Sequence, residues 1–298
     1  MTMPLRQPLC RVELKREDFD SLRQLVTDRL GLALGPESRS ALERRLRDRL
    51  VHHGHASFAE YAQFLRFSGA AVEEWEELQD LLTVHETYFW RDETQLRSLR
   101  DEVLPLLAEQ GKSRRRLAIW SAGCATGEEV YSLAMLVHDS GLFRDWFVRI
   151  YGTDVSRRCI GVARRGVFQA SSFRTMPPEL RRHYFHERAD GMHVVERLRS
   201  YCSFGQINLA QPEKVSLVGH QDAILCRNVL IYLDGAARRR LIEGFLERLL
   251  PGGILVLGHA ESLARVSNAF ELLPLKGDLV YRKPLGSFRS APEFLKPT

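Results

Sequence analysis

The spacing of apolar residues in the first ninety residues is helical throughout. The stretch 36–54, for example, places Leu42, Leu46 and Leu50 on one face and has a plausible stop at Gly54. The pattern predicts four helices, within residues 16–31, 36–54, 57–69 and 70–85. Nothing in this part of the sequence has the alternation of a strand. We therefore expect residues 1–90 to form a small all-helical domain.

From residue 93 the pattern changes, and apolar strand-like runs alternate with amphipathic segments. Such alternation predicts an α/β domain with a mostly parallel sheet and helices on both faces. We expect this domain at 91–285, with a short β-hairpin insertion near 181–205 and a poorly ordered tail at 286–298. The predicted strands are 115–123, 146–156, 222–232, 252–261 and 278–284, and the main predicted helices are 93–111, 127–141, 156–168 and 235–250.

Several polar or glycine residues fall where predicted strands end. They are Gly123, Asp154, Arg227 and Asn228. In open α/β sheets, ligands bind outside the carboxyl ends of the strands. These separate segments therefore predict one shared binding site at that edge of the sheet.

The segment IWSAGCATGEEVYSLAML at 119–136 is a strand, a Gly-rich turn and a helix in sequence. Glu128 and Glu129 stand where a phosphate-binding P-loop needs a lysine, and the dinucleotide pattern G-x-G-x-x-G is absent. A cationic or zwitterionic ligand such as S-adenosylmethionine suits this turn better than a pyrophosphate. An acid at the end of the next strand, Asp154, could accept ribose hydroxyls. The alternative is that the two glutamates merely favour a helix N-terminus.

Composition excludes several classes of protein. Hydrophobic residues make up 44% and charged residues 27%, which is ordinary for a globular protein. No apolar run approaches the ~20 residues of a membrane span, and the first residues lack the apolar core of a secretory signal, so we expect a cytoplasmic protein without membrane insertion. The five cysteines form no C-x-x-C pair, and no zinc pattern is present, so no metal site is expected. The apolar or small neighbours of Cys124, Cys202 and Cys226 predict reduced packing residues.

The formal net charge of +5 is a mild basic bias that fits an acidic protein partner. The second predicted helix concentrates arginines, among them Arg45 and Arg49. They form either a solvated face with i,i+4 partners such as Glu43, or a docking surface for an acidic substrate, because the guanidinium fork grips carboxylates well. The sequence shows no base-methylation signature and no basic stripe with aromatics, so no nucleic-acid partner is expected.

Six segments together resemble the CheR family of chemotaxis receptor methyltransferases along nearly the whole chain. They are TVHETYFWRD (83–92), IWSAGCATGEEVYSLAM (119–135), GTDVS (152–156), INLAQP (207–212), CRNVLIY (226–232) and GGILVLGHAESL (252–263). The resemblance implies a helical domain followed by a Rossmann-like, S-adenosylmethionine-dependent methyltransferase domain. It also implies methyl esterification of glutamate side chains in the cytoplasmic domain of chemoreceptors, which sets receptor adaptation.

The resemblance also implies roles for individual residues. Tyr232 looks like the tyrosine that lines the methyl-transfer site. Arg91 is a candidate to orient either the incoming carboxylate or the carboxylate of the cofactor's methionine part. The positions that match the family's cofactor contacts are His85, Thr87, Arg91, Glu128, Asp154, Asn208, Leu209, Arg227 and Asn228. His85 departs from the asparagine or glycine that is usual there, and Trp90 replaces the usual phenylalanine.

Two further expectations concern partners and rivals. Some family members bind a peptide at the receptor's C-terminus through an inserted β-subdomain, but the segment between Phe185 and Leu198 looks short, so we expect no such tether. The main rival hypothesis is a non-catalytic S-adenosylmethionine-binding regulatory or scaffolding module. A nucleic-acid methyltransferase and an NAD enzyme are weaker rivals.

Overall fold

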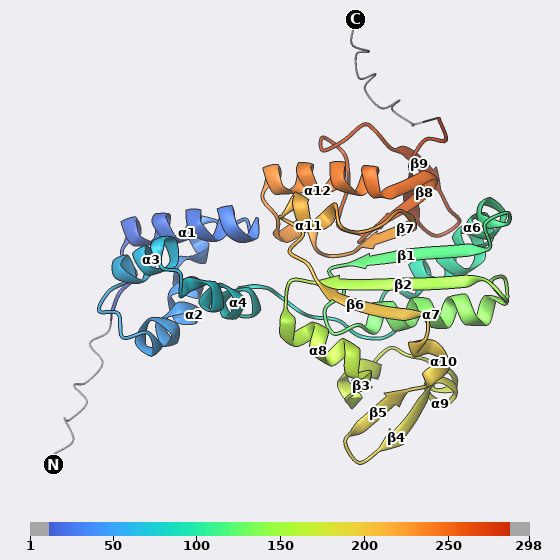
Figure 1. Cartoon of the computed structure of the whole chain (residues 1–298), viewed down its shortest axis with the longest axis horizontal. Coiled ribbons are helices and arrows are strands. Elements are labelled where there is room, and N and C mark those ends of the chain that lie inside the picture. Colours follow the sequence, from blue (N-terminus) through green and yellow to red (C-terminus); the bar gives the residue numbers. More distant parts are fainter. Residues whose placement is uncertain (1–11, 287–298) are drawn as a thin grey trace, which may run out of the picture. The chain divides into compact units, whose positions relative to one another are not determined.

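The computed structural model describes residues 12–286, which divide into two compact units (Figure 1). The first unit contains the residues up to Val84 together with Tyr232–Ala237, and the second contains the rest. The poorly ordered tail predicted at 286–298 lies, from residue 287 on, outside the described residues, and so does Cys10. Among the described residues, no helix is both long and apolar enough to cross a membrane.

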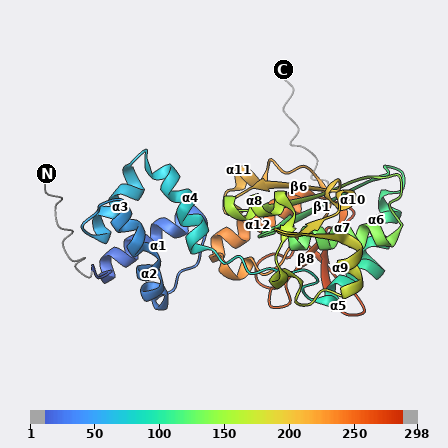
Figure 2. The same ribbon diagram turned by 90° about the horizontal axis from the view of Figure 1, so that it is seen from below.

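The first unit is built on four helices, which Figure 2 shows from below. Their apolar faces meet in one core that includes Leu22, Leu46, Tyr61 and Trp75, each 5% exposed or less. Their bounds are α1 (Arg16–Leu30), α2 (Arg39–His52), α3 (Phe58–Phe67) and α4 (Ala71–Leu82). The helices of this unit follow the predicted stripes, because each stripe buries one face against the others.

The helix ends of this unit follow local sequence signals. α1 is followed by Gly31 with a left-handed φ of 70°, whose N–H donates to the carbonyl of Thr27. At the start of α3, the N–H of Glu60 donates to Ser57 Oγ at 3.2 Å, and Glu60 Oε2 accepts from the N–H of Ala56 at 2.8 Å. The second contact is shifted one residue from an ideal capping box.

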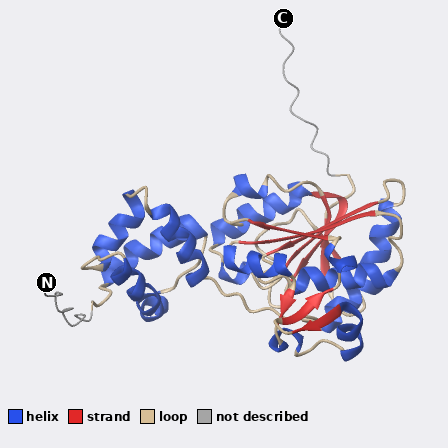
Figure 3. Cartoon of the chain, turned by 60° about the horizontal axis from the view of Figure 1, so that its bottom comes forward, coloured by secondary structure: helices blue, strands red, loops and turns tan. Residues whose placement is uncertain are grey.

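Helices and strands alternate in the second unit, with the main sheet lying between helices (Figure 3). The helices are α5 (Glu93–Ser98), α6 (Leu104–Gly111), α7 (Glu128–Ser140), α8 (Arg157–Arg165), α9 (Pro178–Tyr184), α10 (Glu196–Arg199), α11 (Pro212–Val215) and α12 (Gly235–Arg248), and a π-helical turn, η2 (Leu99–Val103), joins α5 to α6. The strands are β1 (Arg116–Ala122), β2 (Phe147–Asp154), β3 (Val167–Phe168), β4 (Phe185–Arg188), β5 (Gly191–Val194), β6 (Cys202–Gln206), β7 (Gln221–Cys226), β8 (Leu249–Leu257), β9 (Glu271–Pro274) and β10 (Leu279–Arg282).

Seven strands form the main sheet in the order β6-β2-β1-β7-β8-β10-β9. The pairs among β6, β2, β1, β7 and β8 are parallel, and β10 pairs antiparallel with both β8 and β9. From β1 the chain moves first to β2 and β6 on one side and later to β7 and β8 on the other. This reversal places a topological switch point between β1 and β7, where ligands bind in such folds.

A separate three-stranded sheet has the order β3-β5-β4. Its hairpin joins Arg188 to Gly191, and a φ of 137° at Gly191 suits a residue without a side chain. Phe89 packs against Phe168 and Phe173 at ring-centroid distances of 4.8 and 5.0 Å. This packing draws the segment after Val84 into the second unit, so the helical unit ends earlier than the predicted boundary at residue 90.

Several elements differ from the predicted pattern, among them the end of β7, the edge strand β6 and the unpredicted strands β3 and β9. The predicted strand at 222–232 ends at Cys226, and Leu230–Tyr232 forms a short 3-10 turn instead. A positive φ of 59° at Asn228 breaks the extended backbone there. The edge strand β6 was not predicted, because its sequence CSFGQ has neither a clear alternation nor a continuous apolar run.

Candidate functional site

The Gly-rich turn between β1 and α7 is bound to the end of β2. The N–H groups of Gly123 and Cys124 both donate to the carbonyl of Thr153, at 2.8 and 2.9 Å. Gly123 and Gly127 have φ of 83° and 96°, and a Cβ on Gly123 would lie 2.4 Å from Val229 Cγ2. The turn therefore needs glycine for both conformation and space.

Asp154 is the last residue of β2 and faces this turn. Its Oδ2 accepts from the N–H of Ala125 at 2.9 Å, and its Oδ1 accepts from the N–H of Ser156 at 2.9 Å. The residue is 7% exposed. Backbone donors from two loops thus fix the carboxylate at the carboxyl end of the sheet, as the strand-end pattern predicted.

Glu128, the first residue of α7, is buried without an ion pair among the described residues. Its Oε2 accepts from Thr126 Oγ1 at 2.6 Å and its Oε1 from Ser172 Oγ at 2.9 Å. Burial raises the pKa of the Glu128 carboxyl, and the two hydroxyl hydrogen bonds only partly oppose this. A backbone hydrogen bond and the charge of Arg174 act in the same direction as the hydroxyls, but no ion pair neutralises the carboxylate among the described residues. A buried carboxylate of this kind favours a cationic ligand.

Arg227 and Glu129 form an ion pair next to the carboxyl ends of the strands. Arg227 follows β7, and its Nη1 donates to Glu129 Oε2 at 3.0 Å while its Nη2 donates to Asp92 Oδ2 at 2.6 Å. Glu129 Oε1 also accepts from Ser121 Oγ at 2.6 Å. The sequence placed Arg227 beside the cofactor, but its guanidinium, 4% exposed, is committed to these two acids. Its Nε is buried without a hydrogen-bond partner in the protein, so a direct contact of Arg227 with the cofactor stays a prediction beside its role in positioning these segments.

Sequence reasoning missed Asp92 and the structural role of Glu129. Both acids bind the same guanidinium, from positions far from residue 227 in the sequence. The sequence predicts for Glu129 either a part in binding a cationic ligand or a preference for the helix N-terminus, and neither prediction names Arg227 as its partner. The one available signal was the extra acid next to Glu128, which alone does not reveal its partner.

Asn228 presents a polar atom to which no protein group is bonded. Its backbone N–H donates to Glu261 Oε2 at 2.8 Å, and Glu261 also accepts from the N–H of Gly258 at 2.9 Å. Its side-chain Oδ1 is buried and has no hydrogen-bond partner. Buried polar groups in folded proteins are normally satisfied, so this atom indicates a place for an external donor.

The segment 85–91 contains three predicted site residues, His85, Thr87 and Arg91, and belongs to the second unit, as the strand ends do. His85 Nδ1 lies 3.8 Å from Asp154 Oδ1, which places the departure from the family pattern against the predicted ribose-binding acid. Thr87 is half-buried, and Arg91 Nη1 donates to the carbonyl of Glu86 at 3.0 Å. Arg174 stacks 3.6 Å above the Tyr88 ring, which covers this segment from outside the sheet.

The remaining predicted cofactor residues follow β6, beside the end of β2. Asp154 pairs with Gln206 across the two strands, so Asn208 and Leu209 follow within a short loop. Leu209 is 9% exposed, and Asn208 Oδ1 accepts from the N–H of Ala210 at 2.9 Å. This loop supplies an apolar side chain next to the strand ends, which suits the face of an adenine.

Tyr232 belongs to the segment that clusters with the first unit. That segment joins the helical residues through hydrogen bonds from the N–H of Ala33 to the carbonyl of Tyr232 and from the N–H of Asp234 to the carbonyl of Gly31, each 2.8 Å. The side chain of Tyr232 is 38% exposed. Its predicted catalytic role stays a prediction.

The two predicted docking arginines have different environments in α2. Arg49 donates to both oxygens of Glu74, whose carboxylate also binds His53 and Tyr61. Arg49 is therefore a structural residue, and its assignment to docking is corrected because its guanidinium is already paired. Arg45 is exposed and donates one N–H to the carbonyl of Leu82 at 3.2 Å, which leaves most of its fork at the surface.

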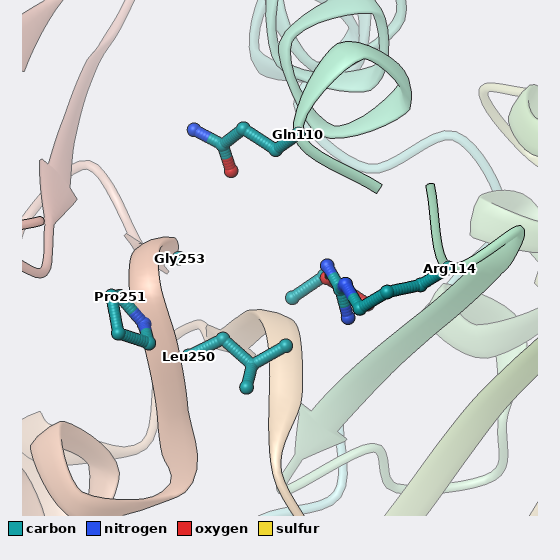
Figure 4. A pocket seen from close by; sticks show the side chains of 6 residues that line it. Gln110, Arg114, Leu250, Pro251 and Gly253 are labelled. Carbon is teal, nitrogen blue, oxygen red and sulfur yellow. The ribbon is translucent and has the colours of Figure 1, made fainter. Parts of the chain in front are cut away.

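A pocket at the opposite end of the sheet is a separate feature (Figure 4). It is lined by Gln110, Arg114, Asp222, Leu250, Pro251 and Gly253. Arg114 Nη2 donates to Asp222 Oδ1 at 2.8 Å, and Asp222 Oδ2 accepts from the N–H of Ala118 at 2.8 Å. Its charged groups are satisfied within the protein, and it lies where parallel strands begin, so it does not continue the strand-end site.

The strand-end site combines an unpaired acid, a fixed acid, an open amide oxygen and an apolar loop. Glu128 can bind a cation, Asp154 can accept hydroxyl donors, and Asn228 Oδ1 can accept one more. Within the Gly-rich turn itself, residues 123–127, there is no lysine or arginine to bind a phosphate. The arrangement therefore suits a ligand that carries an ammonium group and a sugar, without phosphates.

Comparison with known proteins agrees with this chemistry. Residues 17–83 match the family described as CheR methyltransferase, all-alpha domain, and residues 85–278 match CheR methyltransferase, SAM binding domain. Chemotaxis protein methyltransferase 2 of Vibrio cholerae is 35% identical, over 90% of this chain and 93% of its own. Chemotaxis protein methyltransferase 2 of Pseudomonas aeruginosa is also 35% identical, over 89% and 92%, and the Escherichia coli chemotaxis protein methyltransferase is 30% identical over 94% and 95%.

The two matches cover the helical segment and most of the second unit in the order that the sequence predicted. With the strand-end geometry, they confirm the fold class and S-adenosylmethionine as the cofactor. The chain belongs to the CheR methyltransferase family, with an all-α domain followed by an S-adenosylmethionine-binding domain.

Proposed function

We propose that this protein transfers a methyl group from S-adenosylmethionine to glutamate side chains in the cytoplasmic domain of chemoreceptors, forming γ-glutamyl methyl esters. The observation that carries the proposal is the buried Glu128, which has no ion pair among the described residues, at a strand-end site within a CheR-family domain. The relatives named above are chemotaxis protein methyltransferases, which supports a substrate in the same signalling system. The rival hypothesis of a non-catalytic module has no observation in its favour.

The site residues fit the cofactor group by group. Glu128 would hold the ammonium of the methionine part, and Asp154, 7% exposed, would accept from the ribose hydroxyls. Asn208 and Leu209 would lie along the adenine, and Asn228 Oδ1 would gain the donor that it lacks in the protein. The roles of Thr87 and His85 in binding the cofactor belong to the same proposal.

The proposed reaction needs no catalytic base. A glutamate carboxylate of the substrate is ionised at neutral pH and is already a nucleophile. When bound, S-adenosylmethionine supplies a methyl group on a sulfonium, and transfer leaves S-adenosylhomocysteine. The chain's task is then to align the carboxylate oxygen with the methyl carbon and to exclude water.

Two residues are proposed for that alignment. Arg91 is half-buried, with one guanidinium N–H committed to the carbonyl of Glu86 at 3.0 Å, so its remaining donors can orient a carboxylate. Tyr232 would line the transfer site, as the resemblance implies. Replacing either should lower kcat more than it weakens cofactor binding, because each would act on the attacking group.

An exposed basic surface on α2 is proposed to bind the acidic substrate. Arg44 and Arg45 are exposed there, whereas Arg49 is bound to Glu74. A guanidinium group can form two parallel hydrogen bonds with a carboxylate of an acidic receptor helix. Because Arg44 and Arg45 are exposed, a receptor can reach their guanidinium groups. The proposed docking surface is therefore Arg44 and Arg45.

The test is a methyl-transfer assay with radiolabelled S-adenosylmethionine and a purified receptor cytoplasmic fragment. Glutamate esters are hydrolysed by mild alkali to volatile methanol, whereas methylated amines and nucleic acids are stable. Alkali-labile label on the receptor, absent when its accepted glutamates are changed to alanine, is the expected result. Tight cofactor binding with no transfer to any receptor fragment would instead favour the regulatory module.

A further inference from the structure

Three side chains with metal-binding atoms meet at the predicted ribose end of the cofactor site. They are His85, Asp154 and Cys159, and one ligand atom from each lies within 4.8 Å of the others. The residues come from the segment after Val84, the end of β2 and the first turn of α8. The cysteine pattern predicted no metal site, because these ligands become neighbours only through the fold.

The spacing is close to that of a zinc site. With Zn–N near 2.0 Å and Zn–S near 2.3 Å, tetrahedral ligand atoms lie roughly 3.3–3.6 Å apart. His85 Nδ1 and Asp154 Oδ1 are already 3.8 Å apart. All three ligand atoms lie within 4.8 Å of one another, so a contraction of about 1 Å brings them to the spacing of zinc ligands.

The surroundings support the same ligand set. Cys159 lies in the first turn of α8, where its backbone N–H donates to Ser156 Oγ at 3.0 Å. The helix dipole favours a negative charge at that end, as a thiolate ligand requires. Asp154 is held by the N–H groups of Ala125 and Ser156, both 2.9 Å away, which orient its carboxylate as second-layer hydrogen bonds do in metal sites.

We propose that His85, Asp154 and Cys159 form an inhibitory Zn²⁺ site that overlaps the cofactor's ribose position. One nitrogen, one oxygen and one sulfur ligand are a combination that zinc accepts, and the fourth position would hold water. Because Asp154 cannot serve the ion and the ribose together, Zn²⁺ and cofactor exclude each other. The inhibition by Zn²⁺ rests on the proposed cofactor role of Asp154, whereas the metal site itself does not depend on that role.

The first experiment titrates the metal alone into the full chain. Co²⁺ is the probe, because thiolate ligation gives a near-ultraviolet charge-transfer band and tetrahedral geometry gives intense visible bands. One Co²⁺ per chain with both signatures, displaced by Zn²⁺, is expected. His85→Asn and Cys159→Ser should each weaken binding by more than about tenfold, since even indirect metal partners contribute that much.

A matched control uses another cysteine of the same unit. Cys202 pairs with Ile150, whereas Gln206 pairs with Asp154, so this thiol lies at the far end of the paired strands. Cys202→Ser should keep both Co²⁺ signatures. A thiolate band that survives Cys159→Ser, or that is lost in Cys124→Ser instead, would overturn the assignment, as would the absence of stoichiometric binding.

The second experiment tests the overlap with S-adenosylhomocysteine. Saturating S-adenosylhomocysteine should displace Co²⁺, and Zn²⁺ should raise the apparent Kd of S-adenosylhomocysteine in proportion to its concentration. A ternary complex would overturn the inhibitory overlap. If S-adenosylhomocysteine failed to bind even without metal, the cofactor assignment would fall, while the Co²⁺ titration of the three variants would still decide the metal site.

Discussion

Two buried glutamates, one in each unit, are held in opposite ways. Glu74 in the helical unit is 1% exposed, and although burial alone would raise its pKa, hydrogen bonds from Arg49, Tyr61 and His53 outweigh this and lower it. Glu128 in the methyltransferase unit is 2% exposed, and burial raises its pKa because its hydrogen bonds and the charge of Arg174 only partly oppose the loss of water.

The difference separates a structural charge from a binding charge. Glu74 has its cation supplied by Arg49, so its ionised form stabilises the folded helical unit. Glu128 lacks a cation, so its ionised form costs stability until a cationic ligand arrives. Burial alone therefore does not identify a functional acid, and the lack of an ion pair is the feature that makes Glu128 the candidate.

The largest effect is expected from removing the structural partner. Arg49→Ala leaves the Glu74 charge buried and unpaired, which should lower the free energy of unfolding by about 3–5 kcal/mol. Chemical denaturation of the full chain measures the loss. Arg66→Ala, an exposed change on α3, is the control and should have little effect. Equal stabilities for the two variants would show that the Glu74 network is not structural.

The second prediction concerns Glu128→Gln, which should raise the free energy of unfolding where Arg49→Ala lowers it. Without the uncompensated charge, the cofactor-free protein should become more stable at neutral pH, while S-adenosylmethionine affinity should fall by about 2–4 kcal/mol. Thermal unfolding and calorimetry measure the two effects. Glu74→Gln should instead destabilise the protein and leave cofactor affinity unchanged, and matching behaviour of the two variants would remove the distinction.

The opposite pKa shifts also predict different responses to pH. The Glu128 pKa is raised, so protonation favours folding below the ordinary glutamate range and this contribution is lost as the pH rises through the folded pKa. The Glu74 pKa is lowered, so its contribution is present above the ordinary value and is lost as the pH falls through the folded pKa. Cofactor affinity should therefore decline on acidification through the raised pKa of Glu128, and Glu128→Gln should abolish that component.

A smaller loss is expected at the ribose acid. Asp154→Ala should weaken S-adenosylhomocysteine binding by about 1–3 kcal/mol, because the hydroxyl donors would lose their acceptor. Calorimetry at neutral pH measures it. Asp222→Ala, at the opposite end of the sheet, is the matched control. If affinity is the same in both variants, Asp154 does not bind the ribose.

Exposed charges should matter less than either buried glutamate. The double change Arg44→Glu and Arg45→Glu should raise KM for the receptor several-fold and leave cofactor affinity unchanged. The effect should shrink with salt, because exposed charges are screened over about 10 Å at 0.1 M ionic strength. Arg66→Glu, which reverses an exposed charge elsewhere on the helical unit, is the control for a general effect of net charge on KM. A parallel loss of cofactor affinity would contradict a docking role.

No effect is predicted when the receptor's last residues are removed. The free edge of the small sheet is β4, which is four residues long and carries the exposed His186, Glu187 and Arg188. Short, charged edges resist strand addition. Methylation rates should match for full-length and trimmed receptors, and measurable binding of the isolated tail peptide would contradict this.

Local patterns were enough to predict much of the fold. Helical stripes such as Leu42, Leu46 and Leu50 depend only on spacing along the chain, and so do the Gly-rich turn and the acid that ends β2. The carboxyl-end rule then brought Gly123 and Asp154 to one site without any structure. These features follow from the sequence because nearby residues produce them.

Side-chain partnerships between distant residues required the tertiary structure. The sequence alone could not distinguish Arg49, paired with Glu74, from the exposed Arg45 on the same helix. It also could not pair Arg227 with Asp92. Such partners are selected by packing and burial, which place groups from separate segments within hydrogen-bond distance. The sequence by itself therefore determined most of the elements and predicted the edge of the sheet where the cofactor binds. Only the fold decided which charges are already paired within the protein and which are not, because pairing depends on groups from separate segments.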